Sequence, residues 1–244
     1  MSGAPAPDEL SEPTRARLER LVALLATDSS APSSVRDPAE AWRVHIADSL
    51  SGLEFEALGK AARIADLGAG AGFPGLVLAT VLPETPVDLI ESVGRKCEFI
   101  RRAIEEGEIA NARVVCERAE TWAAEPSPSG GRELYDVATA RAVGRLATLA
   151  ELSSPLLREG GVLVAWKGRR DPEEEAELAR AAEALGMRPQ AVRWVGPYAG
   201  SRHRHLHLVE KVGPTPAALP RRPGMAKKRP LGAQQPAGAR RAAL

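Results

Sequence analysis

The sequence predicts an α/β fold built on a mainly parallel, seven-stranded sheet, with a helical cap before the sheet and an antiparallel hairpin at its end. Two observations lead to this prediction. After residue 60, short apolar segments alternate with helical patterns, which is the order of a parallel sheet wrapped by helices. Near the C-terminus, two strand-like segments flank residues 196–201 with no helical pattern between them, so we expect them to pair as a hairpin at the sheet edge.

The cap is predicted from two segments with helical periodicity. Apolar residues recur at helical spacing from Leu18 to Leu25, and Asp37-Pro-Ala-Glu40 combines an N-cap, a first-turn proline and a capping-box glutamate. In the sheet domain, strands are expected near residues 62–67, 87–91, 113–117, 134–140, 161–167, 190–195 and 204–211, and helices near 74–82, 94–106, 146–157 and 173–185.

Composition divides the chain into four segments. Residues 1–13 are rich in Pro, Ala and acidic residues and are expected to be disordered, 14–60 form the cap, 61–212 form one domain, and 213–244 form a basic, Pro-rich tail. The totals of 33 basic and 32 acidic residues nearly cancel, whereas the tail has seven basic residues and no acidic one. With no signal peptide and no apolar run of membrane-span length, we expect a cytoplasmic protein without a membrane partner.

Cysteine and histidine give no sign of a metal centre. Cys97 and Cys116 are too few for a disulfide framework and are not spaced as metal ligands, so both are expected to pack in the core. His203, His205 and His207 alternate along one strand, but no carboxylate or cysteine accompanies them at ligand spacing. We therefore expect no metal.

The segment Ile64-Ala-Asp-Leu-Gly-Ala-Gly-Ala-Gly-Phe-Pro-Gly75 indicates a nucleotide cofactor. A buried strand leads into a turn in which Gly68, Gly70 and Gly72 allow sharp bends and close approach to a ligand. A dinucleotide fingerprint needs G-x-G-x-x-G, but its sixth position is Phe73. An acidic residue before G-x-G-x-G, here Asp66, is typical instead of methyltransferases that use S-adenosylmethionine (SAM).

Three further positions are predicted to complete the cofactor site. Glu91, nineteen residues after Gly72, follows the next strand and is placed to accept both ribose hydroxyls, unless it is only a surface carboxylate. The loop after the third strand brings Ala119 and Glu120 beside the adenine, although Glu120 would serve equally well in helix capping.

The end of the fourth strand is expected to face the reacting methyl group. No [DN]-P-P-[YF] turn follows it and both cysteines lie earlier, so we expect an acceptor that needs neither device; guanine N7, with its free lone pair, fits. Arg141 is predicted to contact the cofactor carboxylate or the guanine O6 and N7 edge, with a structural ion pair as the alternative. Lys167 is predicted to face a phosphate or solvent. His45 and Asp48, three apart on one helix, are interpreted as a helix-stabilising pair without a catalytic role.

The basic tail is predicted to bind RNA. The cluster cannot bury a core, and with no acidic residue nearby in sequence it should stay extended and contact phosphates; a merely solubilising tail is the alternative. The residues concerned are Arg221, Arg222, Lys227, Lys228 and Arg229.

Taken in order, these motifs resemble the bacterial RsmG (GidB) family. The resemblance rests on Trp42-Arg-Val-His-Ile-Ala-Asp-Ser-Leu50, the segment from Asp66 to Gly75, Leu89-Ile-Glu-Ser92, Ala140-Arg-Ala142, Trp166-Lys-Gly168 and residues 220–231, and covers about residues 14–231. It implies a class I (Rossmann-like) SAM-dependent methyltransferase that modifies guanine N7 in the 530 loop of 16S ribosomal RNA, within the small ribosomal subunit or an assembly intermediate. It also implies Gly68, Phe73, Ala119, Glu120 and Arg141 as cofactor contacts.

The mechanism that these residues suggest is direct in-line methyl transfer without a triad or a metal, in which the protein mainly orients the reactants. The alternatives are a methyltransferase of a small molecule, a nicotinamide-dependent oxidoreductase, or a protein that only senses SAM.

Overall fold

The computed structural model describes residues 9–233. One sheet has the strand order β3-β2-β1-β4-β5-β7-β6, in which β1 to β5 run parallel and β7 runs antiparallel to both β5 and β6. The strands are β1 (Ile64–Leu67), β2 (Val87–Ile90), β3 (Ala112–Val115), β4 (Tyr135–Arg141), β5 (Leu157–Lys167), β6 (Met187–Trp194) and β7 (His205–Lys211). This arrangement confirms the predicted fold class and the closing hairpin.

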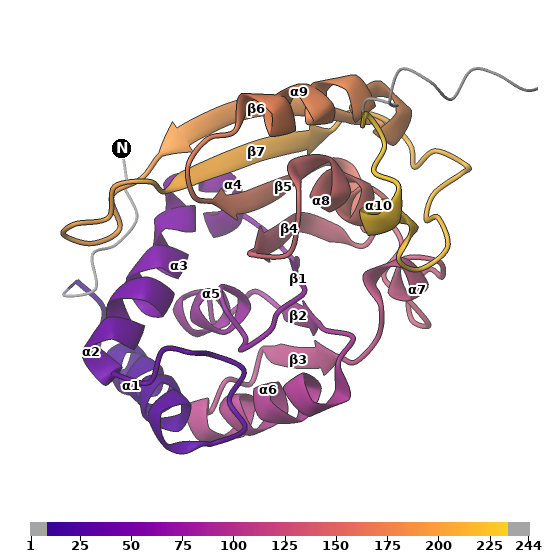
Figure 1. Ribbon diagram of the computed structural model, residues 1–244. Coiled ribbons are helices and arrows are strands. Elements are labelled where there is room, and N and C mark those ends of the chain that lie inside the picture. The colour runs from indigo at the N-terminus through magenta and orange to yellow at the C-terminus, as the bar shows by residue number, and fades with distance from the viewer. Residues whose placement is uncertain (1–8, 234–244) are drawn as a thin grey trace, which may run out of the picture.

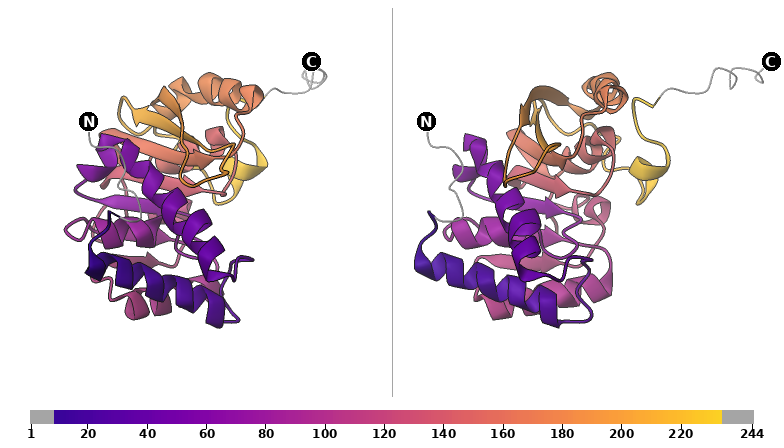
Figure 2. Two further views of the ribbon diagram at one scale, coloured as in Figure 1. Left: turned by 90° about the vertical axis from the view of Figure 1, so that its left-hand side faces the viewer. Right: turned by 60° about the vertical axis from the view of Figure 1, so that its left-hand side comes forward.

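Helices cover both faces of the sheet (Figure 1). Those before the sheet are α1 (Glu12–Thr27), α2 (Pro38–Ala41), the π-helical η1 (Trp42–Ala47), α3 (Asp48–Leu50), the 3-10 turn η2 (Ser51–Glu54) and α4 (Glu56–Gly59). The rest are α5 (Gly75–Val81), α6 (Gly94–Gly107), α7 (Ala119–Trp122), α8 (Leu146–Ser153), α9 (Pro172–Ala181), the 3-10 turn η3 (Glu183–Leu185) and α10 (Met225–Lys228). Figure 2 shows the cap helices on one side of the molecule and the yellow C-terminal segment on the other.

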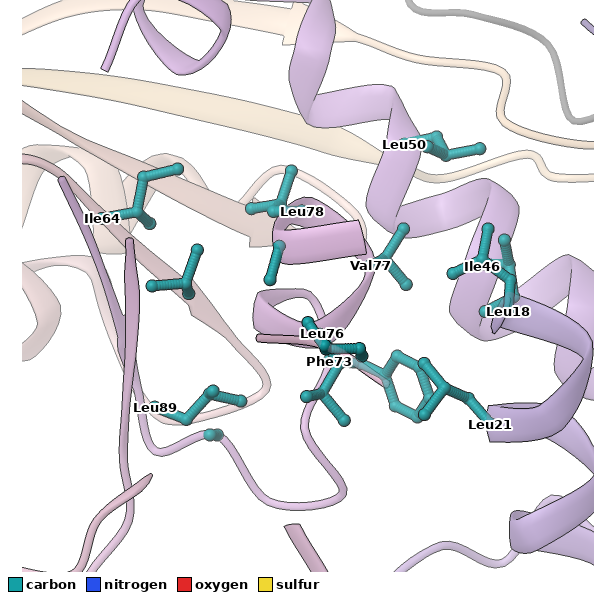
Figure 3. Close-up of a cluster of buried hydrophobic side chains, with 14 of the residues drawn as sticks. Leu18, Leu21, Ile46, Leu50, Ile64, Phe73, Leu76, Val77, Leu78 and Leu89 are labelled. Atoms are coloured by element: carbon teal, nitrogen blue, oxygen red, sulfur yellow. The ribbon is translucent and has the colours of Figure 1, made fainter. Parts of the chain in front are cut away.

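The larger of two cores lies between the sheet and the cap. Leu18 and Leu21 of α1 and Ile46 of η1 are almost fully buried against α5, as Figure 3 shows. Each such side chain contributes about 1.5–3 kcal/mol by leaving water. The other face packs against α7, α8 and α9. The cap is therefore part of the domain that holds the sheet, and its helices have a fixed position at the edge where the strands end.

Several predicted boundaries are wrong. The strand expected at 190–195 begins at Met187, and the helix expected at 173–185 ends at Ala181. Glu12 and Pro13 belong to α1, so the segment expected to be disordered extends too far; residues 1–8 lie outside the described part of the chain. The helix expected at 146–157 ends at Ser153, because β5 already begins at Leu157. Gly160, in the first part of β5, has a φ of 78°, and the β4–β5 pairing shifts register there. Because a glycine of this kind is typical of a turn, the sequence did not indicate that β5 begins before it.

The prediction that both cysteines pack in the core is confirmed for Cys97 and wrong for Cys116. Cys97 and Cys116 form a disulfide with a Cα–Cα distance of 5.8 Å. Cys97 is buried in α6, whereas Cys116 is exposed in the loop after β3. The bond ties α6 to the loop that leads into α7. The pairing of β2 with β3 and the packing of α6 beside β3 bring these two positions together, and their sequence spacing alone gave no indication of it.

Candidate cofactor and acceptor site

A cavity of about 480 Å³, which we call the cofactor cavity, opens at the carboxyl ends of β1, β2 and β4. This volume lies within the range of about 300–1,000 Å³ that is usual for small-molecule sites. Its lining comes from the glycine turn, the end of β2, the loop after β3 and the C-terminal segment, and includes Gly68, Glu91, Lys96, Ala119, Glu120, Val143, Gly224, Lys227 and Lys228. The cavity is therefore mainly apolar, with a few charged side chains at its edge.

The glycine turn takes a backbone conformation that other residues avoid. Gly68, Gly70 and Gly72 have φ values of 63°, 61° and 91°. A Cβ atom on Gly68 would lie 2.8 Å from Cγ2 of Val143, so this glycine is needed for close packing as well as for its φ. Gly68 lines the cavity directly, and the other two shape the turn behind it.

Asp66 supports the turn from inside the protein. Asp66 is 1% exposed, and its carboxylate accepts hydrogen bonds from the Gly75 amide (3.0 Å) and the Thr139 hydroxyl (2.8 Å). Burial raises the pKa of Asp66 from the ordinary 3.8 to about 6, and the two hydrogen bonds oppose this rise. Asp66 is not among the residues that line the cavity, so the structure gives it a positioning role at the start of α5.

Glu91 has the geometry of a ribose-binding carboxylate. It lines the cavity, and its two oxygens accept hydrogen bonds from the Gly70 amide (3.1 Å) and the Val93 amide (2.9 Å). A carboxylate has about four acceptor sites, so each oxygen can still accept a hydroxyl. Glu91 is 5% exposed, so the alternative that the sequence left open, a surface carboxylate, is wrong.

The C-terminal segment folds back over the cavity, so the prediction of an extended tail is wrong over residues 213–233. Arg221 forms a bidentate ion pair with Glu151 (2.6 and 2.5 Å). Glu120, expected near the adenine, accepts a hydrogen bond from the Gly224 amide (2.7 Å) and anchors the turn before α10. Ala119, Lys227 and Lys228 line the cavity rim, whereas Arg222 and Arg229 are exposed; the remainder of the tail lies outside the described residues.

A second cavity, of about 410 Å³, which we call the acceptor cavity, lies between the ends of β4 and β5 and the η1–α3 helix. It is lined by Val44, His45, Asp48, Arg141, Ala142, Trp166, Lys167, Gly168 and Arg204. Ala142 lines both cavities and has a φ of 58°, a conformation that is uncommon without glycine and is concentrated at functional sites.

Arg141 is held by the helical cap. Its guanidinium donates to the Val44 carbonyl (3.1 Å), the Asp48 carboxylate (3.0 Å) and Nδ1 of His45 (3.1 Å). Arginine cannot accept, so Nδ1 of His45 must accept and the neutral ring carries its proton on Nε2, which faces Ser33 (3.1 Å). Burial, with the charge of Arg141, lowers the pKa of His45 to about 4.

His45 and Asp48 thus both bind Arg141, and the interpretation of them as a pair with each other is wrong. The His45 ring also stacks on Phe73, with 4.8 Å between centroids, so Phe73 supports the wall of the acceptor cavity and is not among the cofactor cavity's lining residues. The sequence analysis did not predict that Asp48 binds Arg141 in this cavity. The only indication in the sequence was that Asp48 lies three residues after His45, on the same face of the helix.

Lys167 does not face open solvent. Its ammonium donates to Glu174 (2.6 Å) and to the Gly144 carbonyl (2.9 Å), which fixes the loop after β4.

The three histidines in and just before β7 are not arranged as a metal site. His205 bonds through Nδ1 to the Gly168 carbonyl (2.8 Å), and His207 is buried. Within residues 9–233 no group of three or more His, Cys, Asp or Glu side chains is arranged to hold a metal, and no helix is long and apolar enough to cross a bilayer.

The fold resembles those of solved structures. The structure resembles a SAM-dependent O-methyltransferase from Thermotoga maritima, with a TM-score of 0.54 and 15% identity over 75% of this chain and 72% of that one. It also resembles a mutant of MtNAS in complex with S-adenosylmethionine, with a TM-score of 0.53 and 16% identity over 82% and 73% of the two chains. At such identities the likeness shows the fold alone, which is that of Rossmann-like SAM-dependent methyltransferases.

The sequence comparisons are more specific. The family described as rRNA small subunit methyltransferase G (GidB) matches residues 16–206. Proteins named ribosomal RNA small subunit methyltransferase G are 44% identical in Rubrobacter xylanophilus, over 80% of this chain and 75% of that protein, and 36% identical in Synechococcus sp. (strain JA-3-3Ab), over 91% and 87%. The chain belongs to this family, which confirms the resemblance found in the sequence and agrees with SAM as the cofactor.

Proposed function

We propose that this chain transfers the methyl group of SAM to N7 of a guanine in the 530 loop of 16S ribosomal RNA, in the small subunit or an assembly intermediate. The observation that carries the proposal is the pair of cavities that share Ala142, one lined by a ribose-type carboxylate and the other open beside it. Family membership supports ribosomal RNA as the substrate. The choice of N7 and of this loop comes from the resemblance and from the chemistry of the acceptor cavity.

The residues fit SAM in the first cavity. Glu91 would hold the ribose hydroxyls, the loop at Ala119 would flank the adenine, and Gly68 would let the turn approach the ligand closely. When bound, SAM supplies an electrophilic methyl group on a sulfonium. The chain's own contribution is alignment, which can lower a barrier by roughly 7–11 kcal/mol when the reacting atoms are well placed.

The acceptor side needs no general base. The N7 lone pair forms the new carbon–nitrogen bond as the carbon–sulfur bond breaks, so the base takes the positive charge and no proton moves. His45, the histidine that lines this cavity, is neutral with both ring nitrogens engaged, by Arg141 and Ser33, so it is not free to take a proton. An exocyclic amine must lose a proton on methylation and usually relies on a [DN]-P-P-[YF] turn, and a pyrimidine carbon needs a cysteine nucleophile.

The test is methyl transfer from labelled SAM to small subunits isolated from a strain that lacks this activity. We expect one 7-methylguanine in the 530 loop, identified by mass spectrometry of RNA fragments. Label on another base or another atom would refute the finer proposal. Label that never reaches ribosomal RNA would favour a small-molecule acceptor or a sensor of SAM.

A further inference from the structure

Asp48 is buried with an incomplete set of partners. It is 4% exposed, and its Oδ2 atom accepts a hydrogen bond from Arg141 (3.0 Å). Its Oδ1 atom has no hydrogen bond, although Nε of Arg204 lies 3.3 Å away in an ion pair whose geometry leaves that nitrogen without a hydrogen bond too. A buried polar atom without a partner costs free energy, and such atoms are rare in folded proteins.

Arg204 covers this carboxylate without being fixed to it. The side chain comes from the loop before β7, is 38% exposed, and its Nη2 atom donates to the Tyr198 hydroxyl (3.1 Å) in the same loop. Asp48, in contrast, is held by Arg141, while its main-chain carbonyl accepts from Nε1 of Trp166 (2.8 Å). Of the two groups, the arginine is the one that can move aside.

The chemistry of this carboxylate points to a guanine. The guanidinium of arginine and the N1–C2–N2 edge of guanine present the same planar fork of N–H donors, so Arg204 lies where a guanine edge would. Adenine offers an acceptor at N1, and cytosine offers one at N3, which a carboxylate repels. Uracil offers a single N–H. Of the four bases, guanine alone presents two adjacent donors to a carboxylate.

We propose, on the basis of the function proposed above, that Asp48 recognises the target guanine by accepting hydrogen bonds from N1–H and the N2 amino group, in the place that Arg204 occupies before the base binds. N7 lies on the opposite side of the purine from this edge, so its lone pair stays free to react. Contact of Arg141 with N7, which the sequence suggested, would instead engage that lone pair. Arg141 is committed to Asp48, Val44 and His45.

The same contact would strengthen during the reaction. As the base becomes cationic, N1–H and the N2 amino group become better donors, and the negative charge of Asp48 lies opposite the new positive charge. Interactions that are stronger in the transition state than in the ground state raise the rate of the chemical step. Asp48 would therefore affect kcat as well as recognition.

The experiment uses small subunits reconstituted with 16S RNA that carries guanine, inosine or 7-deazaguanine at the target position. Inosine lacks only the N2 amino group. For the wild-type protein we expect inosine to lower kcat/KM by about 10- to 100-fold, the effect of losing a hydrogen bond to a charged group. In Asp48→Asn, we expect slower transfer to guanine and a guanine-to-inosine ratio close to one, with unchanged affinity for S-adenosylhomocysteine.

A matched control is Glu40→Gln, which removes one negative charge from the exposed end of the same helical segment and should keep the wild-type ratio. Equal rates on guanine and inosine with the wild-type protein would overturn the proposal, and this comparison decides even if Asp48→Asn fails to fold. An unchanged ratio in a folded Asp48→Asn would overturn it as well. Methylation of 7-deazaguanine would refute the N7 assignment instead, and the two failures are thereby distinguished.

Discussion

Replacing Glu91 with alanine should separate cofactor binding from folding. The carboxylate has one free acceptor site on each oxygen for a ribose hydroxyl, because the amides of Gly70 and Val93 use the others. A hydrogen bond to a charged group contributes about 1.5–3 kcal/mol. Two such bonds at the lower end give about 3 kcal/mol, which corresponds to a roughly 100-fold weaker affinity for S-adenosylhomocysteine.

The folded state should lose less. The two amides freed by Glu91→Ala lie at the cavity and can be rehydrated, so we expect a cost of about 0.5–1.5 kcal/mol for each. Isothermal titration gives the affinity and thermal unfolding gives the stability. Glu98→Ala is the matched control, because Glu98 is exposed on α6 and is not among the cavity's lining residues. Unchanged affinity in a folded Glu91→Ala protein would refute the placement of the ribose.

Three further predictions concern the interior, the disulfide and the tail. The pKa of Asp66 is raised from 3.8 to about 6, so between these values the folded state holds a proton that the unfolded state has lost. The wild type should therefore lose about 3 kcal/mol of unfolding free energy as pH rises from about 4 to about 6, whereas Asp66→Asn should not. Parallel curves of unfolding free energy against pH for the two proteins would contradict the assignment. Cys116→Ser opens a loop with a sequence separation of 19 and should cost the oxidised protein about 3 kcal/mol, with no difference under reducing conditions in thermal unfolding. Neutralising Arg222, Lys227 and Lys228 together should lower the slope of log affinity for RNA against log salt by about 2, since each phosphate contact with single-stranded RNA contributes about 0.7; identical slopes would place the RNA elsewhere.

The backbone of the site was predictable from local sequence. The positive φ at Gly68, Gly70 and Gly72 is a demand that glycine alone meets without strain, so the turn was legible in the sequence. Asp37 acts as the N-cap that the sequence predicted, accepting a hydrogen bond from the Glu40 amide (2.7 Å). Strand positions followed from short apolar segments that alternate with helical patterns, and an error arose where the glycine-containing start of β5 resembled a turn.

The partners of the polar side chains were not predictable in the same way. A lone arginine or glutamate has many possible partners, and the sequence gives no measure of distance between residues about one hundred positions apart. Arg141 binds Asp48 across a separation of 93 residues, and Glu120 binds the Gly224 amide across 104. The tail looked extended because its own segment has no acidic residue, yet Glu151 on α8 pairs with Arg221.

The sequence by itself therefore determined the sheet, the glycine turn and the family, because each depends on backbone preference and burial over a few neighbouring residues. The tertiary structure decided which partners and which cavity each charged side chain has. It buried Asp66 behind the turn, placed Asp48 in the acceptor cavity and joined Cys97 to Cys116. Those outcomes depend on how distant elements meet across the sheet, and hydrogen bonds and disulfides form only at the short distances that this packing sets.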